Sequence, residues 1–311
     1  MSRTVRAAVV QARPIPSDLP ATLERAASLI DDAARDGAEI VALGEVFFPG
    51  YPSWLDNCPS AALWDSEDTK RVHQRLRENA VAVPSEATTT LSRLAAELEI
   101  VIVASAHERV EAGPGHGTLY AALLTFDASG ELVNHHRKLV PTYTERLVWG
   151  HGDGAGLKVP ETAAGRVGGL ICWEHWMPLA RQAMHDQAEQ IHVAVWPTVH
   201  DAHQLASRHY AFEGRCFVLA AGQVQRAEDL PPELDRLPEL EDDPSAFIQR
   251  GGSAIYDPRG DLLAGPVFEE ETVLVADLDL DQIERETMNL DVTGHYYRPD
   301  VFDFDVNRRR R

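Results

Sequence analysis

Short apolar runs alternate with amphipathic helical stretches along most of this 311-residue chain. Apolar runs at residues 5–10, 39–43 and 100–105 predict buried strands. Between the first two runs, Leu23, Ala26 and Ile30 recur at helical spacing, and Gly37 marks the end of that helix. Residues 85–98 predict a second helix. This alternation is typical of β-α-β units, whose strands are parallel and whose helices cover a sheet.

The second half of the chain repeats this pattern and adds hairpins. Residues 166–171, 191–196 and 216–224 predict strands, and residues 178–187 and 202–212 predict helices between them. One hairpin is expected from residues 120–126 and 132–136, and another from residues 251–257 and 273–277 around Pro258, Arg259 and Gly260. Together these elements predict an α/β fold with a mixed sheet or a pair of sheets, and with helices on the outer faces.

The sequence gives no sign of a division into domains. Neither an internal repeat nor a linker-like composition interrupts residues 1–311, so a single domain is expected. Residues 228–244 are acidic and proline-rich with little periodicity, and they predict a surface insertion. Residues 301–311 form a short C-terminal tail, whose last four residues are arginines that are expected to be solvated and frayed.

The charge balance excludes some classes of partner. With 29 basic and 49 acidic residues, the chain has a net charge of −20, which repels nucleic-acid phosphates and anionic lipid. The three cysteines do not form a disulfide framework, and this predicts a reducing compartment. No apolar segment has the length of a signal region or a membrane span, so a cytoplasmic protein without nucleic-acid or membrane partners is expected.

One cysteine stands out by its position. Cys172 directly follows the predicted strand at residues 166–171, and a helix is expected shortly after it. The unpaired N–H groups at the start of such a helix favour a thiolate and stabilise negative charge on a substrate. The other interpretation is a small buried hydrophobe, because most free cysteines are of that kind. Cys58 and Cys216 are interpreted as structural.

Two carboxylates and a lysine carry related signals. Glu45 follows a buried strand and precedes an aromatic, proline-rich loop, where an apolar environment would raise its pKa and suit general acid–base chemistry. Lys138 follows the first hairpin, and Glu145 lies close after it as a carboxylate that would orient the ammonium group. A solvent-facing glutamate and a surface lysine are the alternatives to these roles.

Neither a metal ion nor an organic cofactor is expected. The chain has 13 histidines, but the pairs His135 with His136 and His200 with His203 lack the spacing and the partners of a zinc motif. No glycine-rich phosphate loop follows a strand.

Three segments resemble the nitrilase, or carbon–nitrogen hydrolase, superfamily, whose signature is a Glu, a Lys and a Cys in that order. They are GEVFFPGYP at residues 44–52, HRKLVPTYTERLVWG at residues 136–150 and GLICWEH at residues 169–175. The resemblance covers nearly the whole chain and implies a four-layer αββα sandwich. The residues after the cysteine, Trp173, Glu174 and His175, are similar to those of the true nitrilase branch.

The resemblance also implies a reaction. An organic nitrile would be hydrolysed to a carboxylic acid and ammonia through a thioimidate and a thioester on Cys172. Glu45 would take the thiol proton and activate water, Lys138 would stabilise the tetrahedral species, and Glu145 would hold Lys138. The backbone N–H of Trp173 would support the developing charge. A cyanide-hydrolysing enzyme of the same branch, or an amidase or carbamoylase with the same residues, is the alternative.

A small-molecule nitrile would bind among aromatic residues in or near the motif loops. The expected substrate-binding residues are Tyr51, Trp54, Trp173, His175 and Trp196, with Trp149 and Trp176 nearby. Such an apolar pocket would suit aryl or arylaliphatic nitriles. The resemblance further implies self-association, as a homodimer or a modest homo-oligomer and not as a long filament, because only residues 301–311 follow the GHYYRPD motif at residues 294–300.

Overall fold

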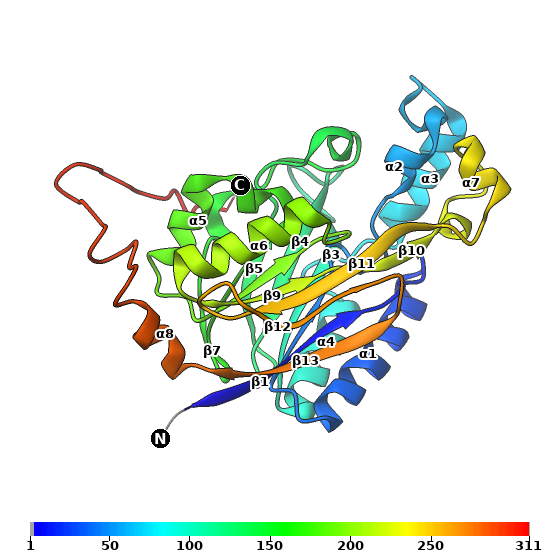
Figure 1. Cartoon of the computed structure of the whole chain (residues 1–311). Helices are drawn as coiled ribbons and strands as arrows, with labels where there is room; N and C mark the ends of the chain where they lie inside the picture. The colour runs from blue at the N-terminus through cyan, green and yellow to red at the C-terminus, as the bar shows by residue number, and fades with distance from the viewer. Residues whose placement is uncertain (1–2, 311) are drawn as a thin grey trace.

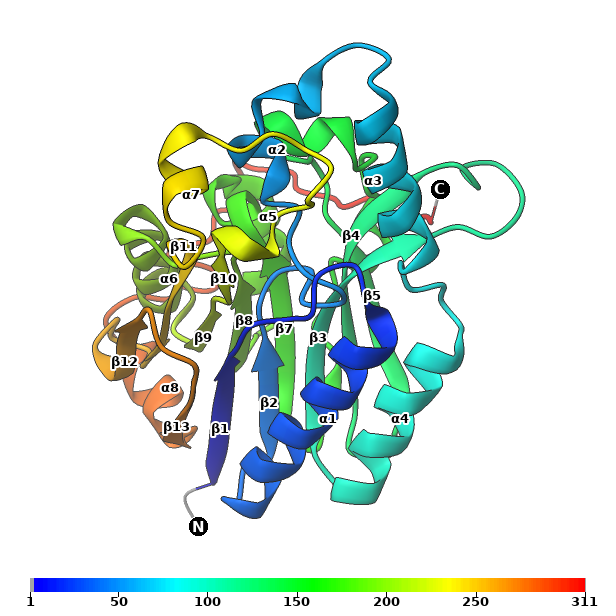
Figure 2. The same cartoon turned by 90° about the vertical axis from the view of Figure 1, so that its right-hand side faces the viewer.

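Two β-sheets packed face to face form the centre of the molecule, and helices cover both outer faces (Figures 1 and 2). The computed structural model describes residues 3–310. The strand order is β13-β1-β2-β3-β4-β5 in the first sheet and β10-β11-β9-β8-β7-β6 in the second, where β12 also pairs with β11. The αββα sandwich that the resemblance implied is therefore confirmed.

The strands of the first sheet are β1 (Thr4–Gln11), β2 (Ile40–Leu43), β3 (Val101–Arg109), β4 (Leu119–Phe126), β5 (Leu132–Arg137) and β13 (Thr272–Asp279). Those of the second sheet are β6 (Glu161–Thr162), β7 (Gly165–Ile171), β8 (Ile191–Val195), β9 (Phe217–Ala221), β10 (Val224–Arg226), β11 (Phe247–Tyr256) and β12 (Leu262–Phe268).

The long helices are divided between the two outer faces. Helices α1 (Leu19–Arg35) and α4 (Glu86–Leu98) cover the first sheet, whereas α5 (Pro178–His185) and α6 (Asp201–Gly214) cover the second. The remaining helices are α2 (Trp54–Asn57), α3 (Glu67–Glu78), α7 (Pro238–Asp242) and α8 (Asp281–Glu286), and short 3₁₀ helices lie at Pro59–Ala62, Tyr143–Leu147, Gly154–Gly156, Cys172–Trp176 and Ala227–Asp229.

Side-chain alternation in β1 explains why this strand lies between two layers. Val5, Ala7 and Val9 pack in the core between the sheets, while Ala8 and Val10 pack in the core beneath the helices of the first sheet. Successive side chains of a strand point to opposite faces. Because both faces of β1 are covered, five of its eight residues are apolar, and Arg6 alone interrupts the apolar run at residues 5–10.

The parallel strands of both sheets direct their carboxyl ends toward one region. Strands β1, β2 and β3 are parallel to one another, and so are β7, β8 and β9. At these ends the two sheets approach closely: a Cβ on Gly44 would lie only 3.0 Å from the backbone carbonyl carbon of Gly222. Residues that directly follow the central strands of either sheet can therefore meet, as ligand sites of α/β folds commonly do.

One predicted hairpin is wrong. Strand β11 turns at Asp257–Gly260 into β12, and not into the segment at residues 273–277. That segment belongs to β13, which pairs antiparallel with β1 in the other sheet. The apolar run at residues 273–276 identified a strand but not its partner. Strand β12 was missed because most of its side chains are exposed and it contains Pro266.

Residues 228–244 contain α7 and bury several apolar side chains. Leu230, Leu234 and Leu240 pack with residues of α2 and α3 in a third apolar cluster. Figures 1 and 2 place α2, α3 and α7 together at one end of the sandwich. None of the helices within residues 3–310 is long and apolar enough to cross a bilayer.

The last residues lie against the body of the protein. Arg308 Nε donates a 3.1 Å hydrogen bond to the carbonyl of Leu157, and Arg310 pairs with Asp153. The expected fraying is therefore wrong for these two arginines, because nearby carbonyl and carboxylate oxygens accept their N–H groups. The prediction for Arg311 lies outside the described residues.

We expect Gly169→Ala to lower the free energy of unfolding by about 1–3 kcal/mol, the usual cost of overpacking a filled core. A Cβ at Gly169 in β7 would lie 2.7 Å from Leu123 Cδ2 and 2.9 Å from the carbonyl oxygen of Val193. Urea denaturation measures the change. Gly117→Ala is the matched control, because nothing lies within 4 Å of a Cβ there. Equal stability of the two variants would contradict the close packing of the sheets.

Candidate active site

Four ionisable side chains from the two halves of the sandwich meet in one place. Glu45 lies just after β2 and Lys138 just after β5 of the first sheet, whereas Cys172 directly follows β7 of the second. Glu145 belongs to the 3₁₀ helix Tyr143–Leu147. All four side chains are buried. The structure thus brings together the four residues for which the sequence predicts catalytic roles.

The ammonium group of Lys138 lies between two carboxylates. Its Nζ donates a 2.7 Å hydrogen bond to Glu45 Oε1 and another of 2.7 Å to Glu145 Oε2. The same nitrogen lies 5.4 Å from the centre of the Trp149 ring. Buried charges are stable only when they are paired and hydrogen-bonded, and these contacts satisfy that requirement. They also hold the positive charge at a fixed point.

Both carboxylate oxygens of Glu145 accept hydrogen bonds. Oε2 accepts the Lys138 bond and a 2.6 Å hydrogen bond from the backbone N–H of Thr142, while Oε1 accepts a 2.8 Å bond from the Tyr51 hydroxyl. This arrangement suits an anchor for Lys138 better than a group that exchanges protons.

Glu45 is fixed by its backbone and has one free carboxylate oxygen. Its N–H donates a 3.1 Å hydrogen bond to the carbonyl of Trp196, and its own carbonyl accepts a 2.6 Å bond from Gln223 Nε2. Oε2 is buried and has no hydrogen-bond partner within residues 3–310. That oxygen is therefore free to take up a proton from a neighbouring group.

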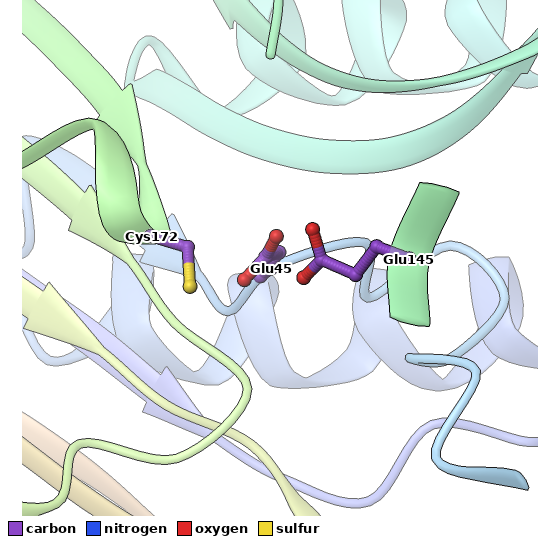
Figure 3. Close-up of side chains that lie close together, drawn as sticks. All are labelled: Glu45, Glu145 and Cys172. Atoms are coloured by element: carbon purple, nitrogen blue, oxygen red, sulfur yellow. The ribbon is translucent and has the colours of Figure 1, made fainter. Parts of the chain in front are cut away.

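Cys172 adopts an unusual backbone conformation. Its φ of 54° lies in the left-handed region, which residues other than glycine seldom occupy. The turn from β7 into the 3₁₀ helix Cys172–Trp176 brings Sγ next to the two glutamates (Figure 3), and one oxygen of each lies within 4.8 Å of the sulfur and of the other oxygen. A thiol and its candidate base are thus in close range.

Burial determines the protonation states of the acid and the thiol. Desolvation raises the pKa of Glu45 to about 7, although the charge of Lys138 opposes this change. The raised pKa predicted for Glu45 is thereby confirmed. Desolvation and the charge of Glu45 raise the pKa of Cys172 well above its usual range. The predicted thiolate is therefore wrong, and the resting thiol needs a base.

Lys138 stays positively charged. Burial alone would lower its pKa, but the charges of Glu45 and Glu145 outweigh burial and raise the pKa. The cluster therefore offers a permanent cation next to a carboxylate that titrates near neutral pH. Such a pair can move protons and stabilise negative charge in the same small volume.

Glu174 connects the segments that carry Lys138 and Cys172. Its Oε1 accepts a 2.8 Å hydrogen bond from the N–H of Leu139, and its Oε2 accepts one of 2.7 Å from the N–H of Ile171. His136 Nε2 lies 2.9 Å from Oε2. Burial would raise the Glu174 pKa, but His136 and the two backbone donors lower it, so this carboxyl is a buried ionic anchor.

A cavity of about 220 Å3 opens beside Cys172. It is lined by Tyr51, Asp56, Thr142, Tyr143, Thr144, Glu145, Cys172, Trp173, Pro197, Thr198, His200, His203 and Gln249. Most of these side chains are polar. The cavity wall is therefore less aromatic than the sequence predicted.

The five predicted substrate-binding residues divide into two groups. Tyr51 and Trp173 line the cavity. Trp54 packs in the apolar cluster of α2 and α3, and the rings of His175 and Trp196 are buried and stack with centroids 4.8 Å apart. The structure does not place these last three side chains in the cavity wall, because they pack in the core.

Several residues of the site were not found from the sequence. Pro197 and Thr198 follow β8, and Gln223 follows β9, so these residues occupy the same kind of position as Glu45 and Cys172. The signal that identifies them is the end of a buried parallel strand. His200 and His203 were considered only as metal ligands, whereas the structure places both in the cavity wall.

The donor atoms of Glu45, Glu145 and Cys172 are close enough together to bind a metal ion. However, Lys138 Nζ already lies 2.7 Å from one oxygen of each carboxylate and occupies the position between them. The ammonium group provides the positive charge that a cation would otherwise supply. The donor set is therefore a poor fit for a resident metal.

Comparisons with known proteins agree with this site and this fold. A family model of the carbon–nitrogen hydrolases matches residues 6–286. An aliphatic nitrilase of Sinorhizobium fredii (strain HH103) is 41% identical over 303 residues, which cover 97% of this chain and 95% of the relative. A bifunctional nitrilase/nitrile hydratase of Lupinus angustifolius is 40% identical over 309 residues, covering 97% of this chain and 86% of the relative.

Solved structures share the fold at lower identity. A carbon-nitrogen hydrolase from Helicobacter pylori G27 matches with a TM-score of 0.74 at 20% identity, covering 96% of this chain and 97% of that one. Saccharomyces cerevisiae Nit3, a member of branch 10 of the nitrilase superfamily, matches with a TM-score of 0.72 at 22% identity, covering 96% of this chain and 98% of that one. The resemblance inferred from the three motifs is confirmed, and the chain belongs to the carbon–nitrogen hydrolase family, the nitrilase superfamily.

Proposed function

We propose that this protein hydrolyses an organic nitrile to the carboxylic acid and ammonia, with Cys172 as the nucleophile. The observation that carries the proposal is the Lys138 ammonium held between Glu45 and Glu145 beside a buried thiol. The relatives that are 41% and 40% identical over nearly the whole chain carry the name nitrilase, which supports the same activity here.

In the first step, Glu45 Oε2 takes the thiol proton of Cys172 and the sulfur attacks the nitrile carbon. A carbon–sulfur bond forms, and one π pair of the triple bond moves to nitrogen, which receives the proton from Glu45. The product is a covalent thioimidate. The fixed charge of Lys138 stabilises the negative charge that develops on nitrogen, at no cost in reorganisation.

Two water molecules complete the reaction. Glu45 accepts a proton as the first water attacks the thioimidate carbon, and Lys138 and the N–H of Trp173 stabilise the tetrahedral species. Glu45 passes this proton to nitrogen, then takes the proton of the new hydroxyl group and passes it to nitrogen as well. The carbonyl forms as the carbon–nitrogen bond breaks, so ammonia leaves and a thioester remains. A second water, activated in the same way, releases the acid and restores the thiol of Cys172. No cofactor is needed for these steps.

Release of an amide is a second outcome of the same tetrahedral species. If the carbon–sulfur bond breaks before the carbon–nitrogen bond, an amide leaves and the thiol is restored. The Lupinus relative is named a bifunctional nitrilase/nitrile hydratase, which supports amide as an additional product. Cyanide hydrolysis and amide or carbamoyl hydrolysis use the same four residues, and only substrate tests separate them.

The cavity favours small nitriles with a polar group over large aryl nitriles. Its volume is about 220 Å3, and Asp56, Thr142 and His200 add hydrogen-bonding groups to its wall. Tyr51, Tyr143 and Trp173 contribute the aromatic surface. A polar group on the substrate can form hydrogen bonds with these side chains, whereas a bulky ring would leave them without partners.

We also propose a cytoplasmic homodimer or modest homo-oligomer. Trp176 and Leu179 near the start of α5, together with Leu205 and Phe212 on α6, are exposed apolar side chains on one helical layer. Burial of such a layer against a second copy would remove it from water. Sedimentation of the purified protein checks this, and either a monomer or fibre-sized particles would contradict it.

We expect wild-type protein to release ammonia from at least one organic nitrile and Cys172→Ala to release none above the uncatalysed background. The substrates are benzonitrile, phenylacetonitrile, an aliphatic dinitrile, cyanide and an amide matched to the best nitrile. Cys216→Ala is the control, because Cys216 is also a buried free cysteine but directly precedes β9. Turnover of the amide with none of the nitriles would refute the proposed function.

We expect kcat/KM for the nitrile to fall about tenfold for each pH unit below 7, because Glu45 must be ionised to take the thiol proton and its pKa is about 7. Above that pH the rate levels off, since the pKa values of Lys138 and Cys172 are both raised. Steady-state rates at constant ionic strength provide the test. A profile that stays flat as pH falls from 7 to about 5 would contradict the assigned base.

A further inference from the structure

Behind Cys172 lies a continuous row of buried polar side chains that takes no part in the steps described above. It consists of His175 in the 3₁₀ helix Cys172–Trp176, His192 in β8, Glu189 just before β8, and Tyr210 in α6. All four are buried. Because each buried polar group needs a partner, every hydrogen bond in the row constrains the next one.

Four hydrogen bonds connect the row to the nucleophile. His175 Nδ1 lies 2.6 Å from the carbonyl oxygen of Cys172, and its Nε2 lies 2.9 Å from His192 Nε2. His192 Nδ1 lies 2.7 Å from Glu189 Oε1. The Tyr210 hydroxyl donates a 2.7 Å bond to Glu189 Oε2, and its ring stacks on His192 at 3.7 Å.

The carbonyl of Cys172 sets the direction of the first two links. A carbonyl only accepts, so His175 must donate from Nδ1. Burial lowers the pKa of His175 to about 3, so this ring is neutral and its Nε2 has no proton. His192 must therefore donate from Nε2 to His175.

The direction continues to Glu189. Burial lowers the pKa of His192 well below its usual value, so this ring is also neutral and its Nδ1 accepts. The hydrogen atom in that contact must then come from Glu189, which is a protonated carboxylic acid. Burial raises the pKa of Glu189 to about 8, in agreement with this assignment. Its other oxygen accepts from Tyr210, so every link is satisfied in one direction.

The neighbouring strand leaves space for this carboxyl group. A Cβ at Gly168 in β7 would lie only 2.0 Å from Glu189 Oε1. A glycine inside a strand weakens the strand unless another group needs the space. Here the space is filled by the oxygen that binds His192.

The row acts on the peptide unit between Cys172 and Trp173. A trans peptide is planar, and its C=O and N–H point in opposite directions. Holding the Cys172 carbonyl on the buried side therefore turns the Trp173 N–H toward the cavity, which both residues line. This N–H is in the first turn of a helix, where no acceptor is available within the helix. The φ of 54° at Cys172 makes such external support necessary.

We propose that Glu189, as a neutral carboxylic acid, is a positioning residue for the nitrile hydrolysis proposed above and acts through His192 and His175 to aim the Trp173 N–H at the reacting atom. Glu189 itself touches no substrate. The inference rests on the proposed function for its chemistry, but the hydrogen-bond direction rests on the buried contacts alone.

Two substitutions of Glu189 test whether its hydrogen bonds, and not its charge, support catalysis. Glu189→Gln keeps an N–H donor toward His192 and a carbonyl acceptor for Tyr210, so we expect kcat and KM within about threefold of wild type. Glu189→Leu removes both, and a small misalignment of a reacting group can lower the rate by about 10²-fold. We expect kcat to fall about 10- to 100-fold with KM nearly unchanged, as for an interaction made only in the transition state.

Two controls test whether a lower kcat results from loss of stability. Thermal unfolding of each variant identifies loss of stability, and Asp257→Asn is a control acid in the turn between β11 and β12. Asp257 Oδ1 accepts backbone N–H bonds from Arg259 and Asp261, and its Oδ2 accepts a 2.6 Å bond from Gln282 Nε2 that the amide nitrogen of asparagine cannot accept. We expect Asp257→Asn to lower stability without changing kcat. The ¹⁵N NMR signals of His192 provide a readout independent of activity, and we expect a neutral ring with its proton on Nε2 in wild type and in Glu189→Gln.

The outcomes test the positioning role of Glu189 separately from the proposed nitrile hydrolysis. An imidazolium at His192, or an equal loss of kcat in Glu189→Gln and Glu189→Leu, would overturn the neutral acid. Unchanged kcat in Glu189→Leu would overturn the positioning role. If wild-type protein hydrolyses only amides, the proposed function fails, and the same kcat comparison is made on the amide, because that reaction also places negative charge on an atom facing the Trp173 N–H.

Discussion

The ammonium group of Lys138 lies 2.7 Å from a carboxylate oxygen of Glu45 and 2.7 Å from one of Glu145, and all three groups are almost completely buried. Removing one partner of a buried ion pair typically costs about 3–5 kcal/mol, because a charge then remains without compensation. Each member therefore constrains the other two. The same charges raise the Lys138 pKa, and burial raises the pKa of Glu45 to about 7, so the contacts that hold the cluster also set its chemistry.

Two sheets are needed to bring this cluster to Cys172. Lys138 and Glu45 follow strands of one sheet and Cys172 follows a strand of the other, while Glu174 bonds to backbone N–H groups on both sides of the gap. The side chain of Cys172 thus faces the charged cluster, and its carbonyl is held from behind by His175. Separate buried networks position the nucleophile and its backbone.

Periodicity and motifs predict much of this arrangement. The apolar runs that became β1, β2, β3, β7, β8 and β9 are nearly continuous because both faces of these strands are covered, and this pattern is visible in sequence. Strand partners are not visible, since β13 pairs with β1 across more than 260 residues of chain. The thiol state of Cys172 was mispredicted because desolvation, which depends on the folded surroundings, outweighs the helix terminus. The row behind Cys172 joins residues 172 to 210, and no local pattern marks it.

The central claim is that Cys172 becomes covalently bonded to the substrate carbon beside the Lys138 cluster. Mass spectrometry of enzyme quenched with acid during turnover of its best nitrile tests this claim most directly. The account predicts a peptide containing Cys172 that carries the added mass of the thioimidate or the thioester. An adduct on Cys58 or Cys216, or steady turnover without any adduct on Cys172, would contradict it.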